Sequence, residues 1–203
     1  AFAQAMENQQ LMTIEQLEQI LLDYRCENNF TASDMDALKS DDVDSILPLF
    51  LPVDSEAYYG IAGTAVRTLM RLVDTGLYPD KAYIMQKTED ENGALQKVEG
   101  EKGFVSALGG KGNALQFTAS VFGQEEFVSV DEDALDAIGE LLNCINGLYV
   151  SECKDGSSLE LMPPSFKTGI QGFESRKMLV LPIHIKNDCI DLMIAIGDEI
   201  EMK

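Results

Sequence analysis

The stretch "DAIGELLNCINGLYVSE", residues 136–152, has the periodicity of a long amphipathic helix. We expect this helix to open just upstream, at a capping box formed by Ser129 and Glu132. At about 100° per residue its apolar side chains share one broad face, formed by Leu135, Ile138, Leu141, Leu142 and Ile145. Four residues gather within roughly 60° on the opposite side: Asp136, Glu140, Asn143 and Gly147.

This polar stripe has two interpretations. It is the solvated side of a surface helix, or it is a site. The stripe contains no Lys or Arg to pair with its acids, and Gly147 leaves its far end bare. A carboxylate and a carboxamide one turn apart can hold a water molecule or a partner's cation, because Glu accepts hydrogen bonds while Asn donates and accepts. Helix geometry alone favours the solvated surface.

The segments around this helix predict an α+β domain, in which a largely antiparallel sheet packs with two long helices. The first long helix starts after Ser55 and stops before Gly76 and Pro79. Strand-like segments follow at residues 81–88 and 94–100. Further segments predict two hairpins: one joins 103–108 to 114–122 through the turn "GGKGN", and the other joins 176–185 to 188–196 through a short loop.

Residues 1–53 predict a helical N-terminal extension or linker, which we separate from a main domain at residues 54–203. Thr13 and Gln16 form a capping box before a helix with apolar residues at helical spacing. Ser33 is expected to cap a shorter second helix. The segment is too small for an independent domain, so its apolar stripes must pack on the main body, on a second copy or on an upstream domain.

Charge and cysteine usage restrict the class of partner. The chain carries 15 Lys and Arg against 35 Asp and Glu, a net charge of −20. Such a field repels phosphate backbones and anionic lipid, so we expect neither a nucleic acid nor a membrane as partner. Cys26, Cys144, Cys153 and Cys189 show no C-x-x-C pairing and no zinc spacing, and we expect buried free thiols and a cytoplasmic location.

Other catalytic constellations are not suggested by the sequence. His184 is the only histidine, so a zinc site or a Ser-His-Asp arrangement has little to build on. The turn at residues 109–113 lacks the phosphate-loop order, and we expect no helix directly after it. The acidic runs lack the EF-hand pattern. We therefore expect no cofactor bound by this chain.

The stretch "DAIGELLNCINGLY", together with "SSLELMPPSFKTG" after it, resembles the helix and following strand of the CheX-type chemotaxis phosphatases, which are relatives of CheC and of the FliY middle domain. The signature of that family is an acidic or hydroxyl residue, then Glu, then Asn, with a proline further on. This chain supplies Asp136, Glu140, Asn143, Pro163 and Pro164. The resemblance extends from about Asp54 to the C-terminus.

The resemblance implies a protein phosphatase that hydrolyses the aspartyl-phosphate of a CheY-like receiver domain. Glu140 would contact the lysine of the receiver, and Asn143 would orient the attacking water. Asp136 and Gly147 would support them. The resemblance also implies that the receiver supplies Mg²⁺, that this chain needs no cofactor of its own, and that it forms a homodimer.

Three departures from the family pattern keep an alternative open. The first long helix carries Thr64 and Arg67 where two-site relatives carry Glu and Asn, which implies a single site. Residues 121–127 are shorter than the helix that the family has at this point. The N-terminal helices are extra, and we interpret them as a linker from a fused receiver or as a docking element. The alternative function is a non-catalytic interaction or output module in a two-component or chemotaxis pathway.

Overall fold

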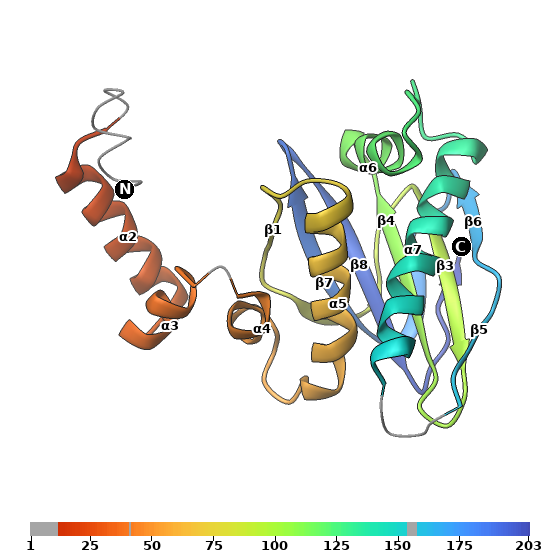
Figure 1. The fold of residues 1–203 in the computed structure, drawn as a ribbon, viewed down its shortest axis with the longest axis horizontal. Coiled ribbons are helices and arrows are strands. Elements are labelled where there is room, and N and C mark those ends of the chain that lie inside the picture. The colour runs from red at the N-terminus through yellow and green to blue at the C-terminus, as the bar shows by residue number, and fades with distance from the viewer. Residues whose placement is uncertain (1–11, 41, 154–157) are drawn as a thin grey trace. The chain divides into compact units, whose positions relative to one another are not determined.

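The computed structural model describes residues 12–40, 42–153 and 158–203. The chain forms two compact units, residues 1–46 and 47–203. The first unit holds the helices α2 (Ile14–Asn28), α3 (Ala32–Ala37) and α4 (Val43–Ile46), which Figure 1 labels. The predicted division between an extension and a phosphatase domain, at residues 53 and 54, stays a prediction.

Local capping determines where the helices of the first unit begin. Gln16 N donates to Thr13 Oγ1 (3.2 Å) and Thr13 N donates to Gln16 Oε1 (2.8 Å), so the predicted capping box is confirmed. The predicted cap of the next helix is wrong. Thr31, and not Ser33, starts α3, because Thr31 and Asp34 exchange the same pair of hydrogen bonds.

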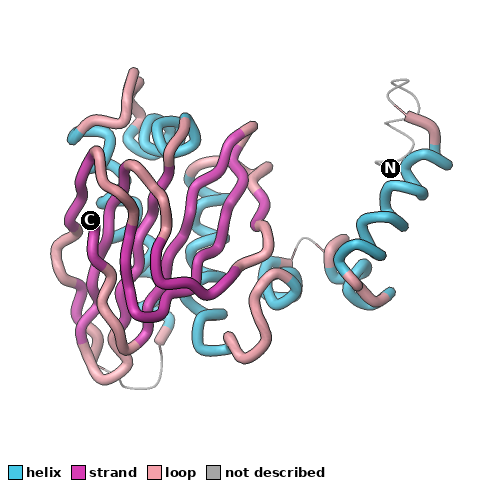
Figure 2. Tube along the Cα trace, turned by 180° about the vertical axis from the view of Figure 1, so that it is seen from behind, coloured by secondary structure: helices cyan, strands magenta, loops and turns pink. Residues whose placement is uncertain are grey.

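The second unit is an α+β domain with an antiparallel sheet, as predicted. The sheet follows the order β1-β7-β8-β4-β3-β5, while β2 and β9 pair with β7 and β6 pairs with β3. The helices of this unit lie on one face of the sheet (Figure 1), and Figure 2 shows the opposite face. The elements are η1 (Leu47–Leu49), α5 (Glu56–Leu72), β1 (Tyr78–Pro79), β2 (Tyr83–Lys87), β3 (Asn92–Glu99), β4 (Phe104–Gly110), α6 (Asn113–Gly123), α7 (Glu132–Glu152), β5 (Glu160–Leu161), β6 (Ser165–Thr168), β7 (Phe173–Ile185), β8 (Asp188–Ile196) and β9 (Glu201–Met202).

The apolar face of α7 is fully buried, as the periodicity predicts. Its five side chains have 0% of their surface exposed, and so have the alternate residues of β7 and β8. Full burial of one such side chain contributes about 1.5–3 kcal/mol relative to leaving it in water. In the sheet, α7 packs on β3, β4 and β6. This contact fixes the helix in place. The buried residues are Leu135, Ile138, Leu141, Leu142 and Ile145 on α7, with Leu179, Leu181, Ile183, Leu192 and Ile194 on the strands.

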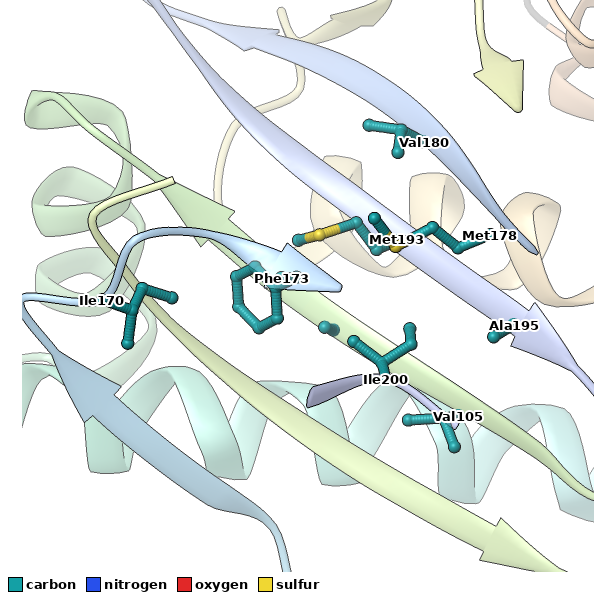
Figure 3. Close-up of a cluster of buried hydrophobic side chains, with 9 residues drawn as sticks. Val105, Ile170, Phe173, Met178, Val180, Met193, Ala195 and Ile200 are labelled. Carbon is teal, nitrogen blue, oxygen red and sulfur yellow. The ribbon is translucent and has the colours of Figure 1, made fainter. Parts of the chain in front are cut away.

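A second apolar cluster forms on the face of the sheet away from the helices (Figure 3). Phe173, which is fully buried, packs there on a glycine pair. Gly93 and Gly109 lie opposite each other on β3 and β4. A methyl group on Gly93 would lie 2.5 Å from Phe173 Cζ, and one on Gly109 would lie 2.7 Å from Phe173 Cε2. The aromatic ring thus occupies the space that two side chains would need.

The predicted hairpin at residues 103–122 is wrong. β4 is present, but the segment after the glycine turn is the helix α6 and not a second strand. Asp188, at the start of β8, accepts a hydrogen bond from Ala114 N (3.1 Å) and so caps the first turn of α6. The expectation that no helix follows residues 109–113 is therefore also wrong. Helix α6 ends at Gly123, so the chain does have a helix between β4 and α7. The departure noted at residues 121–127 arose because the start of this helix was predicted as a strand.

Two shielded carboxyl groups lie side by side on the outer face of the sheet. Asp191 pairs with Gly109 in the β4–β8 register, and a methyl group on Gly109 would lie 2.8 Å from Asp90 Cγ. Asp90 is 4% exposed and accepts a hydrogen bond from Thr88 Oγ1 (2.5 Å). Burial, together with the nearby charge of Asp90, raises the pKa of Asp191 to about 6.

We expect Asp191→Asn to stabilise the protein above pH 6. The ionised form of Asp191 is disfavoured in the folded state, so the folded state binds this proton more tightly than the unfolded state does. The protonated carboxyl group therefore favours folding fully below about pH 4, and this contribution is lost as the pH rises through 6. The substitution should raise the free energy of unfolding at pH 8 by ~2 kcal/mol and flatten its pH dependence between 4 and 7. Urea unfolding at several pH values measures this. The prediction would be contradicted if the free energy of unfolding of Asp191→Asn varied with pH as steeply as that of the exposed control Glu126→Gln.

Candidate functional site

Asp131 is the N-cap of helix α7, so the predicted capping box of Ser129 and Glu132 is wrong. Asp131 Oδ1 accepts a hydrogen bond from Ala134 N (3.0 Å). Glu132 and Asp133 lie in the first turn, where their negative charge interacts favourably with the helix dipole. The helix then runs without interruption to Glu152, so it presents its whole polar side from one rigid element.

A glycine and a proline determine how closely the middle of α7 approaches the neighbouring strand. Gly139 is buried, and a methyl group there would lie 3.3 Å from Pro164 Cβ. Pro164 immediately precedes β6, which pairs with β3. The glycine therefore allows the helix to pack against the proline, and this contact lies directly beside Glu140. The glycine and the proline in the quoted motif have a packing role.

The predicted polar stripe lies on the outward side of α7. Asp136 and Glu140 are exposed, while Asn143 and Gly147 are half-buried. Within the described ranges, the side chain of Glu140 has neither a hydrogen bond nor an ion pair. Its carboxylate is thus available to a cation from outside the chain. Asn143, one turn further along, is held in place by other residues of the chain.

The carboxamide of Asn143 belongs to a polar network between α7 and the sheet. Gln96 Nε2 donates to Asn143 Oδ1 (2.7 Å) and to the backbone oxygen of Met162 (2.8 Å). Asn146 Nδ2 donates to Gln96 Oε1 (2.7 Å), and Ser106 Oγ donates to Asn146 Oδ1 (3.0 Å). Gln96, Asn146 and Ser106 are each 0% exposed. The network holds Asn143 from beneath, at the edge between the core and solvent.

No sequence pattern considered above predicted a role for Gln96, Asn146 or Ser106. A signal for them existed. Asn146 lies on the apolar side of the α7 helical wheel, and Gln96 and Ser106 lie opposite each other at inward positions of β3 and β4. Buried polar side chains require partners, so three such positions on facing elements indicate a network. Finding it required the pairing of the strands, which periodicity alone does not provide.

On α5, the residues at the equivalent of the Glu140–Asn143 pair form a different arrangement. Thr64 is 3% exposed, and its Oγ1 donates to Glu152 Oε2 (3.3 Å) while it accepts from Arg67 (3.2 Å). Arg67 also lies 3.9 Å from Glu152 Oε2. These contacts join α5 to the end of α7. Thr64 and Arg67 therefore have a structural role in α5, and the single site stays a prediction.

The remaining candidates from the sequence have ordinary surroundings. The prediction of buried thiols is wrong: Cys26 and Cys144 are exposed, and Cys153 and Cys189 are half-buried. Cys144 is exposed because it lies on the outward side of α7, next to Asn143. His184 lies in β7, stacked on Tyr78 with ring centroids 4.8 Å apart.

Neither a metal-binding group nor a membrane-spanning helix is found among the residues that the structure describes. No group of three or more His, Cys, Asp and Glu side chains there is arranged to hold a metal ion. The helices described there are too short or too polar to cross a membrane.

Comparison with known proteins shows a family resemblance over part of the chain. Residues 93–184 match the family model of the chemotaxis phosphatase CheX. This region is CheX-like. It begins in β3, includes α7 with Glu140 and Asn143, and ends in β7. The resemblance that the sequence indicates is therefore confirmed. A search of curated protein sequences gives no match.

Solved structures share the CheX-like fold of the second unit. A CheC-like superfamily protein from Shewanella sp. PV-4 has a TM-score of 0.59 at 15% identity, covering 71% of this chain and 99% of that chain. CheX from Desulfovibrio desulfuricans has a TM-score of 0.58 at 14% identity, covering 70% and 99%. A CheX–CheY–BeF₃–Mg²⁺ complex from Borrelia burgdorferi has a TM-score of 0.54 at 18% identity, covering 70% and 97%. Identities this low show the fold alone.

Proposed function

We propose that this chain is a protein phosphatase that hydrolyses the aspartyl-phosphate of a CheY-like receiver domain, and that it acts in the cytoplasm, as a homodimer. The observation that carries the proposal is the pair formed by Glu140 and Asn143 on the outward side of α7, within the region that matches the CheX model. The CheX–CheY complex among the similar structures supports a receiver as partner.

Each residue of the pair has a separate role in this proposal. The carboxylate of Glu140 accepts hydrogen bonds from the ammonium group of the receiver's lysine, which holds the partner in register. Asn143 orients a water molecule in line with the phosphorus. The water oxygen forms a bond to phosphorus, and the bond between phosphorus and the aspartyl oxygen breaks. The electron pair leaves with the restored carboxylate, and the water proton passes to the phosphate product.

The proposed chemistry needs orientation more than it needs a nucleophile. An acyl phosphate is already activated, so a correctly placed water accounts for most of the catalysis. The charge on the phosphoryl oxygens would be neutralised by Mg²⁺ bound to the receiver, and this chain would bring no metal. Asp136, one turn before Glu140, adds negative charge that favours the approach of a lysine. Gly147 leaves room for the partner beyond Asn143.

The test is phosphate release from phosphorylated receivers of the same organism. Wild-type protein should accelerate release from at least one receiver. Glu140→Ala should weaken receiver binding, and so raise KM, by about tenfold, which corresponds to the ~1.4 kcal/mol of one hydrogen bond to a charged group. Glu132→Ala, which removes another exposed carboxylate of the same helix, is the matched control and should leave KM unchanged. The proposal would be wrong if wild-type protein left the rate of phosphate loss unchanged for every phosphorylated receiver.

The alternative is a non-catalytic module that binds a receiver and passes the signal on. One observation that favours it is the set of contacts among Thr64, Arg67 and Glu152. These contacts give a purely structural role to the part of α5 that is equivalent to Glu140 and Asn143 on α7. The helices before residue 47 also favour it, either as the linker from a fused receiver or as a docking element. The same assay distinguishes the two functions: a module would bind the phosphorylated receiver and lengthen or leave unchanged its lifetime.

A further inference from the structure

We infer that Gln96 is a positioning residue that fixes the direction of the Asn143 carboxamide, so that the Nδ2 group of Asn143, and not its oxygen, faces the receiver. This inference rests on the proposed function. Asn143 reaches the outward side of α7, whereas Gln96 lies beneath it on β3 and is fully buried. Gln96 would therefore act through Asn143 and never touch the substrate.

The direction of the network follows from a single backbone oxygen. A carbonyl oxygen only accepts, so the end of Gln96 that lies 2.8 Å from the oxygen of Met162 must be the Nε2 group. The same Nε2 lies 2.7 Å from the Asn143 side chain, which must therefore present its oxygen to Gln96. The Nδ2 group of Asn143 is left on the other side. Asn143 makes no further side-chain hydrogen bond to the residues that the structure describes.

The hydrogen bonds of Asn146 and Ser106, on the other side of Gln96 from Asn143, are consistent with this direction and stabilise it. Gln96 Oε1 accepts from Asn146 Nδ2 at 2.7 Å, and Asn146 Oδ1 accepts from Ser106 Oγ at 3.0 Å. Gln96 and Ser106 are opposite each other on β3 and β4. Reversal of any one amide would place two acceptors or two donors against each other in a buried site, at the cost of an unmade hydrogen bond. The direction is thus set by the core.

The chemical consequence is a division of donors and acceptors on α7. Asn143 presents a donor and Glu140 presents an acceptor. The Nδ2 group can donate to one lone pair of the attacking water, which leaves the other lone pair directed at phosphorus. Glu140, lacking a donor when ionised, is suited to the receiver's lysine and not to the water's oxygen. The two side chains are therefore not interchangeable in the proposed reaction.

Hydrogen exchange of the side-chain amides, followed by NMR on the wild-type protein, tests the direction without any assay of activity. The amide protons of Gln96 and Asn146 should exchange slowly with solvent, because both groups are buried donors. Those of Asn143 should exchange rapidly. Exchange at Asn143 as slow as that at Gln96 would mean that the Nδ2 group of Asn143, and not its oxygen, faces Gln96. That result would overturn the inference whether or not the chain is a phosphatase.

Gln96→Met tests the positioning role. This substitution keeps the length of the side chain and removes both of its polar groups. We expect kcat for phosphate release to fall by about 30-fold with KM within about twofold, because misplacement of the water affects the reaction and not the docking. Gln116→Met is the matched control, since it removes another glutamine that donates to a backbone oxygen (Phe127 O, 2.5 Å). Gln116 lies on α6 and is not part of the network, so this substitution should leave kcat unchanged.

The two proposals fail in different ways. If wild-type protein acts on no receiver, the proposed function fails, while the exchange experiment still decides the direction of the amide. If wild-type protein is active and Gln96→Met keeps its full kcat, the positioning role is wrong and the proposed function stands. If Gln96→Met does not fold, Gln96→Glu replaces it. The carboxylate would face two acceptors, Met162 O and Asn143 Oδ1, and kcat should fall at least as far, with full kcat again overturning the role.

Discussion

Replacement of Asn143 by alanine is expected to lower kcat for receiver dephosphorylation by about two to three orders of magnitude, the usual loss when one oriented donor is removed from a reacting centre. The proposed role explains the size. Without the Nδ2 group, water reaches the phosphorus only in random orientations. KM should change little, because the contact that holds the partner comes from Glu140.

The substitution is structurally mild, which makes this result interpretable. Asn143 is half-buried at the edge of the network, and Gln96 keeps its hydrogen bonds to Met162 and Asn146. We expect the free energy of unfolding to fall by about 1 kcal/mol, the net contribution of one hydrogen bond. Binding to a beryllofluoride-activated receiver should be retained. Asn113→Ala, on the exposed start of α6, is the control, and equal activity of the two variants would refute the role of Asn143.

Phe173→Ala is expected to have the largest effect on stability, a loss of about 4 kcal/mol in the free energy of unfolding. The ring is fully buried and lies directly on Gly93 and Gly109. Neither glycine has a side chain that can move into the space, so the cavity stays open on the side of the sheet. Urea unfolding with circular dichroism measures the loss.

Two further substitutions serve as comparisons for Phe173→Ala. Phe173→Leu should cost roughly 1–2 kcal/mol, since a smaller apolar group still covers part of the glycine pair. Tyr78→Ala removes an aromatic ring that is 57% exposed and should cost much less. A loss below about 2 kcal/mol for Phe173→Ala would show that the sheet relaxes into the cavity, against the packing argument.

Elements with a strong local signal were predictable from the sequence. The five buried residues of α7 recur at helical spacing, so periodicity located both the apolar face and the polar stripe with Glu140 and Asn143. The hairpin of β7 and β8 was predictable because two apolar runs flank a short polar loop. The capping box of Thr13 and Gln16 requires only four consecutive residues. In each case the deciding interactions are close in sequence.

Residues 114–122 show why another element was mispredicted. Leu115, Phe117, Ala119 and Val121 alternate with other residues, as in a strand, yet the buried positions Ala114, Leu115, Thr118 and Ala119 recur as in a helix. The segment satisfies both periods, and its composition does not separate them. Asp188 provides the N-terminal cap of α6 from 74 residues away. A contact of that range is absent from any local pattern.

The sequence by itself determined the α+β class, the long helix α7 and the stripe on which Glu140 and Asn143 lie, because side-chain spacing encodes which face of an element is buried. Only the tertiary structure decided what Asn143 presents to solvent. The direction of its carboxamide depends on Gln96 from β3, Met162 from the segment before β6, and Asn146 beneath it. Hydrogen bonds between elements have no periodicity along the chain, so they appear only when those elements have been brought together.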